Sequence, residues 1–149
     1  MGGDDVKAAI ISQRTEQGKV MKTEYIDIVG KWGIVVYYDI RPFDEYDIRS
    51  DMMAFGVNGQ TIEKAVNLLL YEKNKGYSVS SFNRKMTLVF IGKATGEDQW
   101  WDTLGHELLD HCQKAIVDYY DVPYVSEDSA WLTGYLLRKV VQQIAVPCK

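Results

Sequence analysis

The sequence is poor in the residues that mark several specialised classes of protein. Its 149 residues include two cysteines, three prolines and two histidines. Two lone cysteines, Cys112 and Cys148, supply neither a disulfide framework nor the ligand spacing of a zinc finger. The longest apolar runs, such as Gly33–Tyr38 and Leu88–Gly92, are far shorter than the roughly 20 residues that cross a bilayer. We therefore expect neither a disulfide-stapled secreted fold nor a membrane protein.

An excess of charge of one sign is also missing. The chain carries 17 Lys and Arg against 21 Asp and Glu, which gives a formal net charge of −4. This mildly acidic balance offers no electrostatic footprint for nucleic acid or for an anionic membrane. The first residues, Met1–Val6, hold two acids and two glycines and do not resemble a secretory signal. We expect a cytoplasmic protein that binds neither nucleic acid nor membrane.

Apolar residues are plentiful enough for one core. They make up 46% of the chain, and aromatic residues make up 12%, which excludes wholesale disorder. A chain of this length fits one domain. Residues 1–22 are mostly polar and are expected to form an N-terminal arm. Residues 23–149 are expected to form a single α+β domain.

Alternating apolar residues predict three strands. The alternation over residues 25–28 and again over residues 34–38 has the period of a half-buried strand. Gly30 and Gly33 stand between these two stretches, so a bulge or a tight hairpin is expected there. Met86–Ile91, rich in β-branched and aromatic residues, predicts the third strand.

Helical spacing predicts three helices. One runs from the N-cap Thr61 to Gly76, the second over Asp98–Tyr120, and the third from the N-cap Ser126 to Pro147. Arg41–Asp51 contains a proline and many charges and is expected to be a solvated loop. Ser78–Asn83 is interpreted as a polar stretch that leads into the third strand. The order β-β-α-β-α-α predicts an α+β fold, a small sheet packed against three helices.

Each of the two C-terminal helices shows one apolar stripe that predicts its buried face. In the first helix the stripe comprises Trp101, Leu104, Leu108, Cys112, Ala115 and Tyr119. In the second it comprises Trp131, Leu132, Tyr135, Leu136, Val140 and Ile144.

Both histidines, His106 and His111, lie on the first of these helices, and Glu107 follows His106 directly. In the zinc-protease signature two histidines at i and i+4 bind one ion from one helix face, and a Glu beside the first histidine acts as general base. Here position i+4 is Asp110, and the second histidine stands at i+5. The pattern therefore resembles the signature with one residue displaced.

Two geometries could restore a metal site. Asp110 could ligate zinc itself through a carboxylate oxygen. Alternatively, a π-bulge of one residue could carry His111 into the i+4 place. Without a bulge, His111 lies about 140° around the helix from His106 and the two imidazoles cannot share an ion. A third possibility is a decayed site that binds no metal.

A third ligand has one candidate on the last helix. His106, Glu107 and Asp110 project away from the apolar stripe, so they face either water or a cleft. Catalytic zinc takes three protein groups, and Glu127 stands in the first turn of the next helix, which Pro123 folds back. As an alternative, Glu127 is an ordinary first-turn acid that stabilises the helix dipole.

Parts of the chain resemble a family of small zincin-like metallopeptidases found in phages and prophages. The resemblance covers roughly residues 85–140 and rests on the strand Met86–Ile91, the stretch Thr95–Glu107 and the segment Ser126–Leu136. It implies a minimal zincin-like α+β domain in which the helix with the metal motif is central. It also implies metal ligation by His106 and Glu127 and base chemistry by Glu107. The departure from the family pattern is Asp110 in the place of the second histidine.

The sequence thus predicts a zinc-dependent metallopeptidase acting on a peptide or protein substrate. We expect Zn²⁺ to be held by His106, by His111 or Asp110, and by Glu127, and Glu107 to activate the attacking water. The strand at residues 86–91 could align an extended substrate by β-addition. The rival hypothesis is a non-catalytic binding or assembly protein of phage or prophage origin. The departure at Asp110 favours this rival, and the presence of Glu107 favours the enzyme.

Overall fold

The computed structural model of the chain describes residues 21–144. The arm predicted at residues 1–22 lies outside this range except for its last two residues. Residues 145–149 at the end of the predicted domain also lie outside it.

Strands and helices follow each other in an order with more elements than the sequence pattern predicts. In chain order they are β1 (Lys22–Ile28), β2 (Trp32–Tyr38), the 3-10 turn η1 (Pro42–Asp44), α2 (Glu45–Phe55), α3 (Gly59–Tyr71), β3 (Gly76–Ser81), β4 (Met86–Ile91), α4 (Glu97–Gly105), the π-helical segment η2 (His106–Cys112), α5 (Gln113–Tyr119) and α6 (Glu127–Gln143). The predicted α+β class is confirmed.

The four strands form one sheet in the order β1-β2-β4-β3. β1 and β2 form the predicted antiparallel hairpin, and the chain turns at Val29 and Gly30, which both have positive φ. β2 and β4 are parallel, and β3 pairs antiparallel with β4. The polar interpretation of Ser78–Asn83 is therefore incomplete, because most of this stretch belongs to the edge strand β3.

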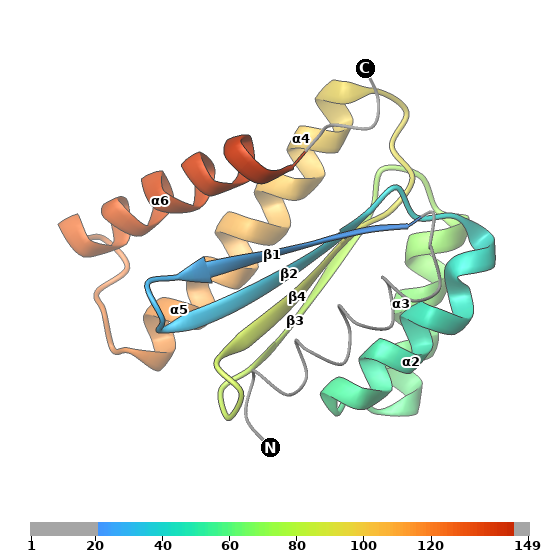
Figure 1. Cartoon of the computed structure of the whole chain (residues 1–149), viewed down its shortest axis with the longest axis horizontal. Coiled ribbons are helices and arrows are strands. Elements are labelled where there is room, and N and C mark those ends of the chain that lie inside the picture. The colour runs from blue at the N-terminus through green and yellow to red at the C-terminus, as the bar shows by residue number, and fades with distance from the viewer. Residues whose placement is uncertain (1–20, 145–149) are drawn as a thin grey trace.

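Helices cover both faces of the sheet (Figure 1). α4, η2, α5 and α6 pack on one face, and α2 and α3 pack on the other. Because both faces are covered, every residue of β2 and β4 is buried. Among the described residues no helix is long and apolar enough to cross a membrane.

The prediction of a solvated loop at Arg41–Asp51 is wrong. This stretch forms η1 and most of α2, which adds a helix to the three predicted ones. Three of its acids, Asp44, Asp47 and Asp51, are buried together with Ile48. The charges hid the helix, because a carboxylate counts as a surface residue in a hydropathy pattern even where the fold buries it.

The predicted long helix at residues 98–120 is present as the continuous run of α4, η2 and α5. Five of its buried apolar residues recur at every fourth position, namely Trp100, Leu104, Leu108, Cys112 and Ile116. In a regular helix of 3.6 residues per turn, steps of four drift around the axis. The π segment, with more residues in each turn, offsets this drift and keeps one face on the sheet. Trp101, Ala115 and Tyr119 of the predicted stripe are consequently only partly buried.

Candidate metal centre

The π-helical segment brings the two histidines together. η2 begins at His106 and ends at Cys112, so His111 swings to the side of the helix on which His106 lies. The Nε2 atoms of the two imidazoles are 3.2 Å apart, and the rings meet edge to face at a centroid distance of 4.7 Å. Of the two geometries that the sequence leaves open, the structure has the π-bulge.

Asp110 contacts His106 instead of pointing at the same site as His111. Its Oδ2 lies 2.9 Å from Nδ1 of His106. When Nδ1–H donates to this carboxylate, the lone pair of the imidazole remains on Nε2, the atom that faces His111. Histidines that bind metals are oriented in this way by a carboxylate. The geometry therefore makes Asp110 a positioning residue for His106.

Glu107 differs from the histidines in its burial. Its side chain belongs to a residue that is only 5% exposed, whereas both histidines are exposed. Ser78 on β3 donates a hydrogen bond of 3.1 Å to Oε2 of Glu107. Burial raises the pKa of the Glu107 carboxyl above its ordinary value, against the opposing effects of His111 and of the Ser78 hydrogen bond.

The three side chains form one group. One ligand atom each from His106, Glu107 and His111 can be chosen so that all lie within 4.8 Å of one another. Two nitrogens bound to one tetrahedral zinc at about 2.0–2.1 Å are separated by about 3.3–3.4 Å. The observed 3.2 Å between the Nε2 atoms fits this requirement. The same distance also fits a hydrogen bond between two neutral imidazoles.

A glycine permits the close approach of the helix to the sheet at this point. A Cβ on Gly76 would lie 2.7 Å from Cγ2 of Thr103 and 2.9 Å from Cγ of Glu107. The edge strand can therefore run directly beside Thr103 and Glu107 only because its first residue has no side chain. A cavity of about 380 Å³ opens next to this contact, between α3, the start of β3 and α4, and both His106 and Glu107 line it.

Glu127 lies apart from this group. It stands exposed in the first turn of α6, after the N-cap Ser126, whose Oγ accepts a hydrogen bond from the Ser129 amide. Gln113 joins α6 to the helix that carries the histidines, because its Nε2 donates to the backbone and side-chain oxygens of Ser129 at 3.0 Å. Of the predicted ligands within residues 21–144, the structure thus gathers His106 and His111 with Glu107, and it leaves Glu127 outside.

Sequence reasoning missed Ser78, the partner of Glu107. Its strand looked like a polar stretch, although Tyr77 and Val79 alternate with Ser78 and Ser80 at strand period and pack against the core on the other face. Cys112 is buried, as its place on the apolar stripe predicts, and burial raises the pKa of its thiol to about 12. This burial in apolar surroundings is typical of a structural cysteine and not of a thiolate nucleophile.

Comparisons of the chain with protein-family models, with curated proteins and with solved structures found no match.

Proposed function

We propose that the chain is a zinc-dependent metallopeptidase whose centre is formed by His106, Glu107 and His111. One observation carries the proposal. A π-helical segment places the Nε2 atoms of the two histidines 3.2 Å apart, and a buried carboxylate adjoins them. The departure from the zinc-protease spacing is thus offset by a departure from regular helical geometry in the same seven residues.

Each residue of the group has a distinct role in this proposal. His106 and His111 hold the metal through Nε2, and Asp110 fixes the ring of His106 through Nδ1. A bound Zn²⁺ would lower the pKa of a water and polarise the carbonyl of a substrate. Glu107 accepts the proton of the attacking water. The hydrogen bond from Ser78 to Oε2 helps to hold the carboxylate in place for this role.

The expected path of the substrate must be corrected. The prediction that Met86–Ile91 aligns a peptide by β-addition is wrong, because β4 lies between β2 and β3 and pairs with both. β3 is the edge strand at this end of the sheet and also carries Ser78 beside Glu107. We therefore assign the alignment of an extended peptide to β3.

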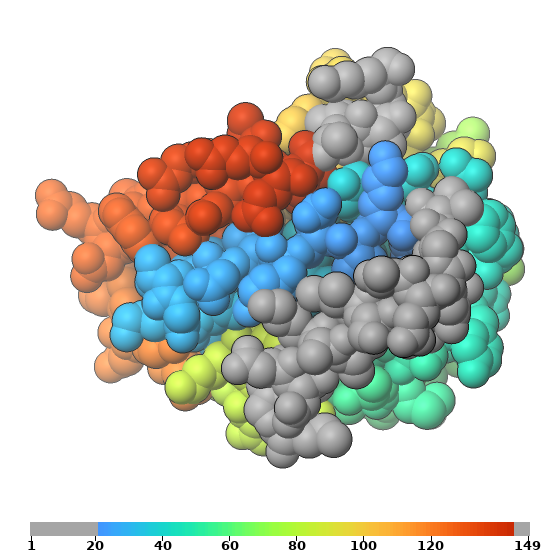
Figure 2. All heavy atoms as spheres, in the orientation of Figure 1, coloured from blue at the N-terminus to red at the C-terminus, as the bar shows by residue number. Residues whose placement is uncertain are grey.

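The opposite edge of the sheet is less suited to peptide addition. Tyr135 and Gln143 of α6 donate to the backbone oxygens of Asp27 and Tyr25 at 3.0 and 2.9 Å. Figure 2 shows α6 and β1 side by side on the surface of the molecule. Two acceptors of the β1 edge are thus already used by α6, which leaves β3 as the better candidate.

Metal content and proteolysis test the proposal separately. Purified protein should contain one equivalent of zinc by elemental analysis, and His106→Ala should lose it. Glu107→Gln should keep the zinc and lose the cleavage of labelled, unfolded casein by about 10²–10⁴-fold, the contribution of a general base. Equal cleavage by the Glu107→Gln variant would contradict the assigned base, and protein without zinc would contradict the metal centre.

The second candidate is a non-catalytic binding or assembly protein that keeps this helix for its shape. The position of Glu127 outside the group favours it, because a catalytic zinc takes three protein ligands. Under this hypothesis the purified protein contains no metal, and the variant His106→Ala melts at the temperature of the unmodified chain. Stoichiometric zinc would rule it out in its simplest form.

A further inference from the structure

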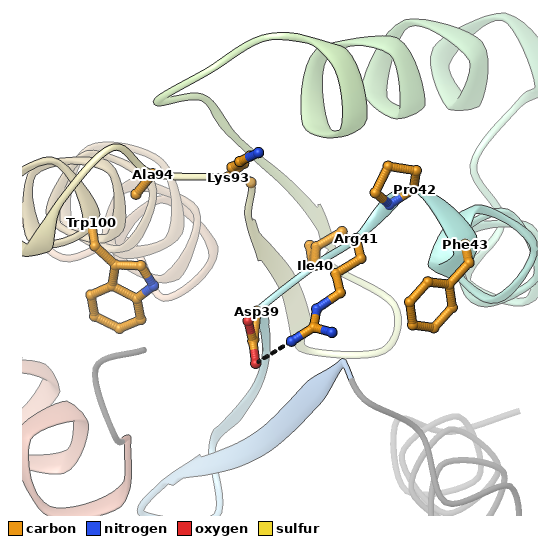
Figure 3. Close-up of a pocket in the computed structure, with 9 residues that line it drawn as sticks. Asp39, Ile40, Arg41, Pro42, Phe43, Lys93, Ala94 and Trp100 are labelled. Carbon is orange, nitrogen blue, oxygen red and sulfur yellow. Dashed lines mark ion pairs between the residues drawn. The ribbon is translucent and has the colours of Figure 1, made fainter. Parts of the chain in front are cut away.

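A second cavity lies away from the metal centre, where the two parallel strands end. It has a volume of about 440 Å³, within the usual range for small-molecule sites, and is lined by the residues that follow β2, by those that follow β4 and by Trp100 of α4 (Figure 3). In open sheets, ligands bind in the crevice beyond the carboxyl ends of parallel strands, at the point where the connections diverge. β2 continues into η1 and α2, whereas β4 continues into α4 on the other face of the sheet.

Backbone geometry keeps this crevice open. Asp39, directly after β2, has a φ of 57° and turns the chain out of the sheet. Directly after β4, a Cβ on Gly92 would lie 2.7 Å from the backbone oxygen of Lys75 and 2.9 Å from that of Leu69. Only glycine fits there. Because it has no side chain, the end of β4 can pack closely against α3. The two chain segments consequently part at the cavity.

The polar groups of this crevice are mainly hydrogen-bond donors. Arg41 and Lys93 contribute two cations, and Asp39 contributes one carboxylate, whose nearest oxygen is 4.0 Å from the Arg41 guanidinium. A pair at that distance is weak and leaves most guanidinium donors available. The remaining walls are apolar or aromatic, with Pro42 and Phe43 at one side and Trp100 at the other.

Trp100 supplies an independent indication of a ligand. The residue is 1% exposed, and its buried indole Nε1 has no hydrogen-bond partner among residues 21–144. Burying an unpaired donor costs about 1–3 kcal/mol. In Figure 3 the nitrogen is on the edge of the indole that faces Asp39 and the end of β2. An acceptor bound in the crevice would give this N–H the partner that the described part of the chain does not provide.

We propose that the crevice binds a small aromatic monocarboxylate. Its carboxylate lies between Arg41 and Lys93 and accepts from the indole N–H of Trp100, while its ring packs against Phe43 and Pro42. The carboxylate of Asp39 leaves the site with one net positive charge, which suits a monoanion better than a dianion. This binding site is separate from the proposed metal centre and does not depend on it.

Phenylacetate is the probe for this proposal, with phenylacetamide as its uncharged match and inorganic phosphate as a bare oxyanion. Isothermal titration of the full chain should show phenylacetate binding at least tenfold more tightly than either control. In NMR spectra the indole N–H resonance of Trp100, assigned by its loss in Trp100→Phe, should shift downfield during the titration. Equal affinity for phenylacetamide or phosphate, or no binding of phenylacetate, would overturn the proposal.

Paired substitutions of exposed cations locate the binding. The double variant Arg41→Met, Lys93→Met should weaken phenylacetate binding at least tenfold. The matched double variant Arg138→Met, Lys139→Met on α6, outside the cavity, should bind as the unmodified chain does. All four residues lie at the surface or only partly buried, so both variants should fold, as near-identical circular dichroism spectra would verify. Equal loss in both pairs would indicate a general charge effect and would contradict the proposed site.

Discussion

The two candidate sites stand on one helical run, the first at its beginning and the second in its middle, and are built in different ways. The crevice near Trp100, at the beginning of α4, exists because two strands distant in sequence end side by side. The group of His106, Glu107 and His111 exists because seven consecutive residues adopt a π-helix. The first site depends on topology and the second on a local irregularity. A motif in the sequence could indicate only the second.

The largest expected effect is a loss of zinc affinity at the proposed metal centre that leaves the crevice unaffected. His111→Ala removes one of two imidazoles, so zinc affinity should fall by at least 10³-fold, as measured by competition with a chromophoric chelator. Glu127→Gln is the matched variant and should leave the affinity unchanged, since Glu127 lies outside the group. A large loss in Glu127→Gln would restore the third ligand that the sequence predicts. Phenylacetate binding at the crevice should be the same in all these variants.

A change at the contact between β3 and the helix that carries the histidines should lower the free energy of unfolding. Gly76→Ala places a methyl group within 3 Å of Thr103 and Glu107, and overpacking of this kind costs about 1–3 kcal/mol. Urea denaturation should show this loss. Gly134→Ala on the exposed side of α6 meets nothing within 4 Å and should instead stabilise the chain by about 0.5–1 kcal/mol. Similar effects of the two substitutions would contradict the close approach.

A smaller effect is expected from the positioning residue. Asp110→Asn keeps an acceptor near Nδ1 of His106 but removes the negative charge, so zinc affinity should fall about tenfold, at the lower end for such partners. Asp118→Asn is the control, because Asp118 pairs with Lys114 on the same helix at 2.7 Å and does not contact a histidine. If Asp110 were itself a ligand, its loss would equal that of His111→Ala.

The smallest effect should come from deleting Leu109. The deletion would place the two histidines at i and i+4, where a regular α-helix brings them together without a π segment. Zinc affinity should stay within about tenfold of that of the unmodified chain, and α5 should keep its packing because the extra residue of the bulge is the one removed. Loss of zinc in this variant would show that the π segment does more than realign His111.

Much of the local structure could be predicted from sequence. The hairpin at Gly30, the strands β1, β2 and β4, and the cap at Ser126 follow from short-range rules, and the structure has them. The helix that begins at Gly59 was predicted with its N-cap at Thr61, but Asn58 takes that place and accepts the Thr61 amide. Such errors of a few residues are inherent in reading boundaries from propensity.

Other features could not be predicted because their cause lies outside the segment itself. Trp131 looked like a core residue, yet it is 56% exposed, because α6 turns Leu132 and Leu136 toward the sheet instead. The serines of β3 made this segment look like a polar loop. It forms a strand because it pairs with β4 along its whole length. Whether a side chain is buried depends on which element packs against it, and a one-dimensional pattern does not contain that information.

The sequence by itself determined the chemical groups of the candidate centre. It supplied two histidines and a glutamate within one helix, and it limited the geometry to two alternatives. Only the tertiary structure decided between them. The π segment keeps every fourth residue of this helix on the face that packs against the sheet. The same segment turns His111 toward His106. The packing of this helix against the sheet, which no local pattern encodes, thus sets the distance between the two imidazoles.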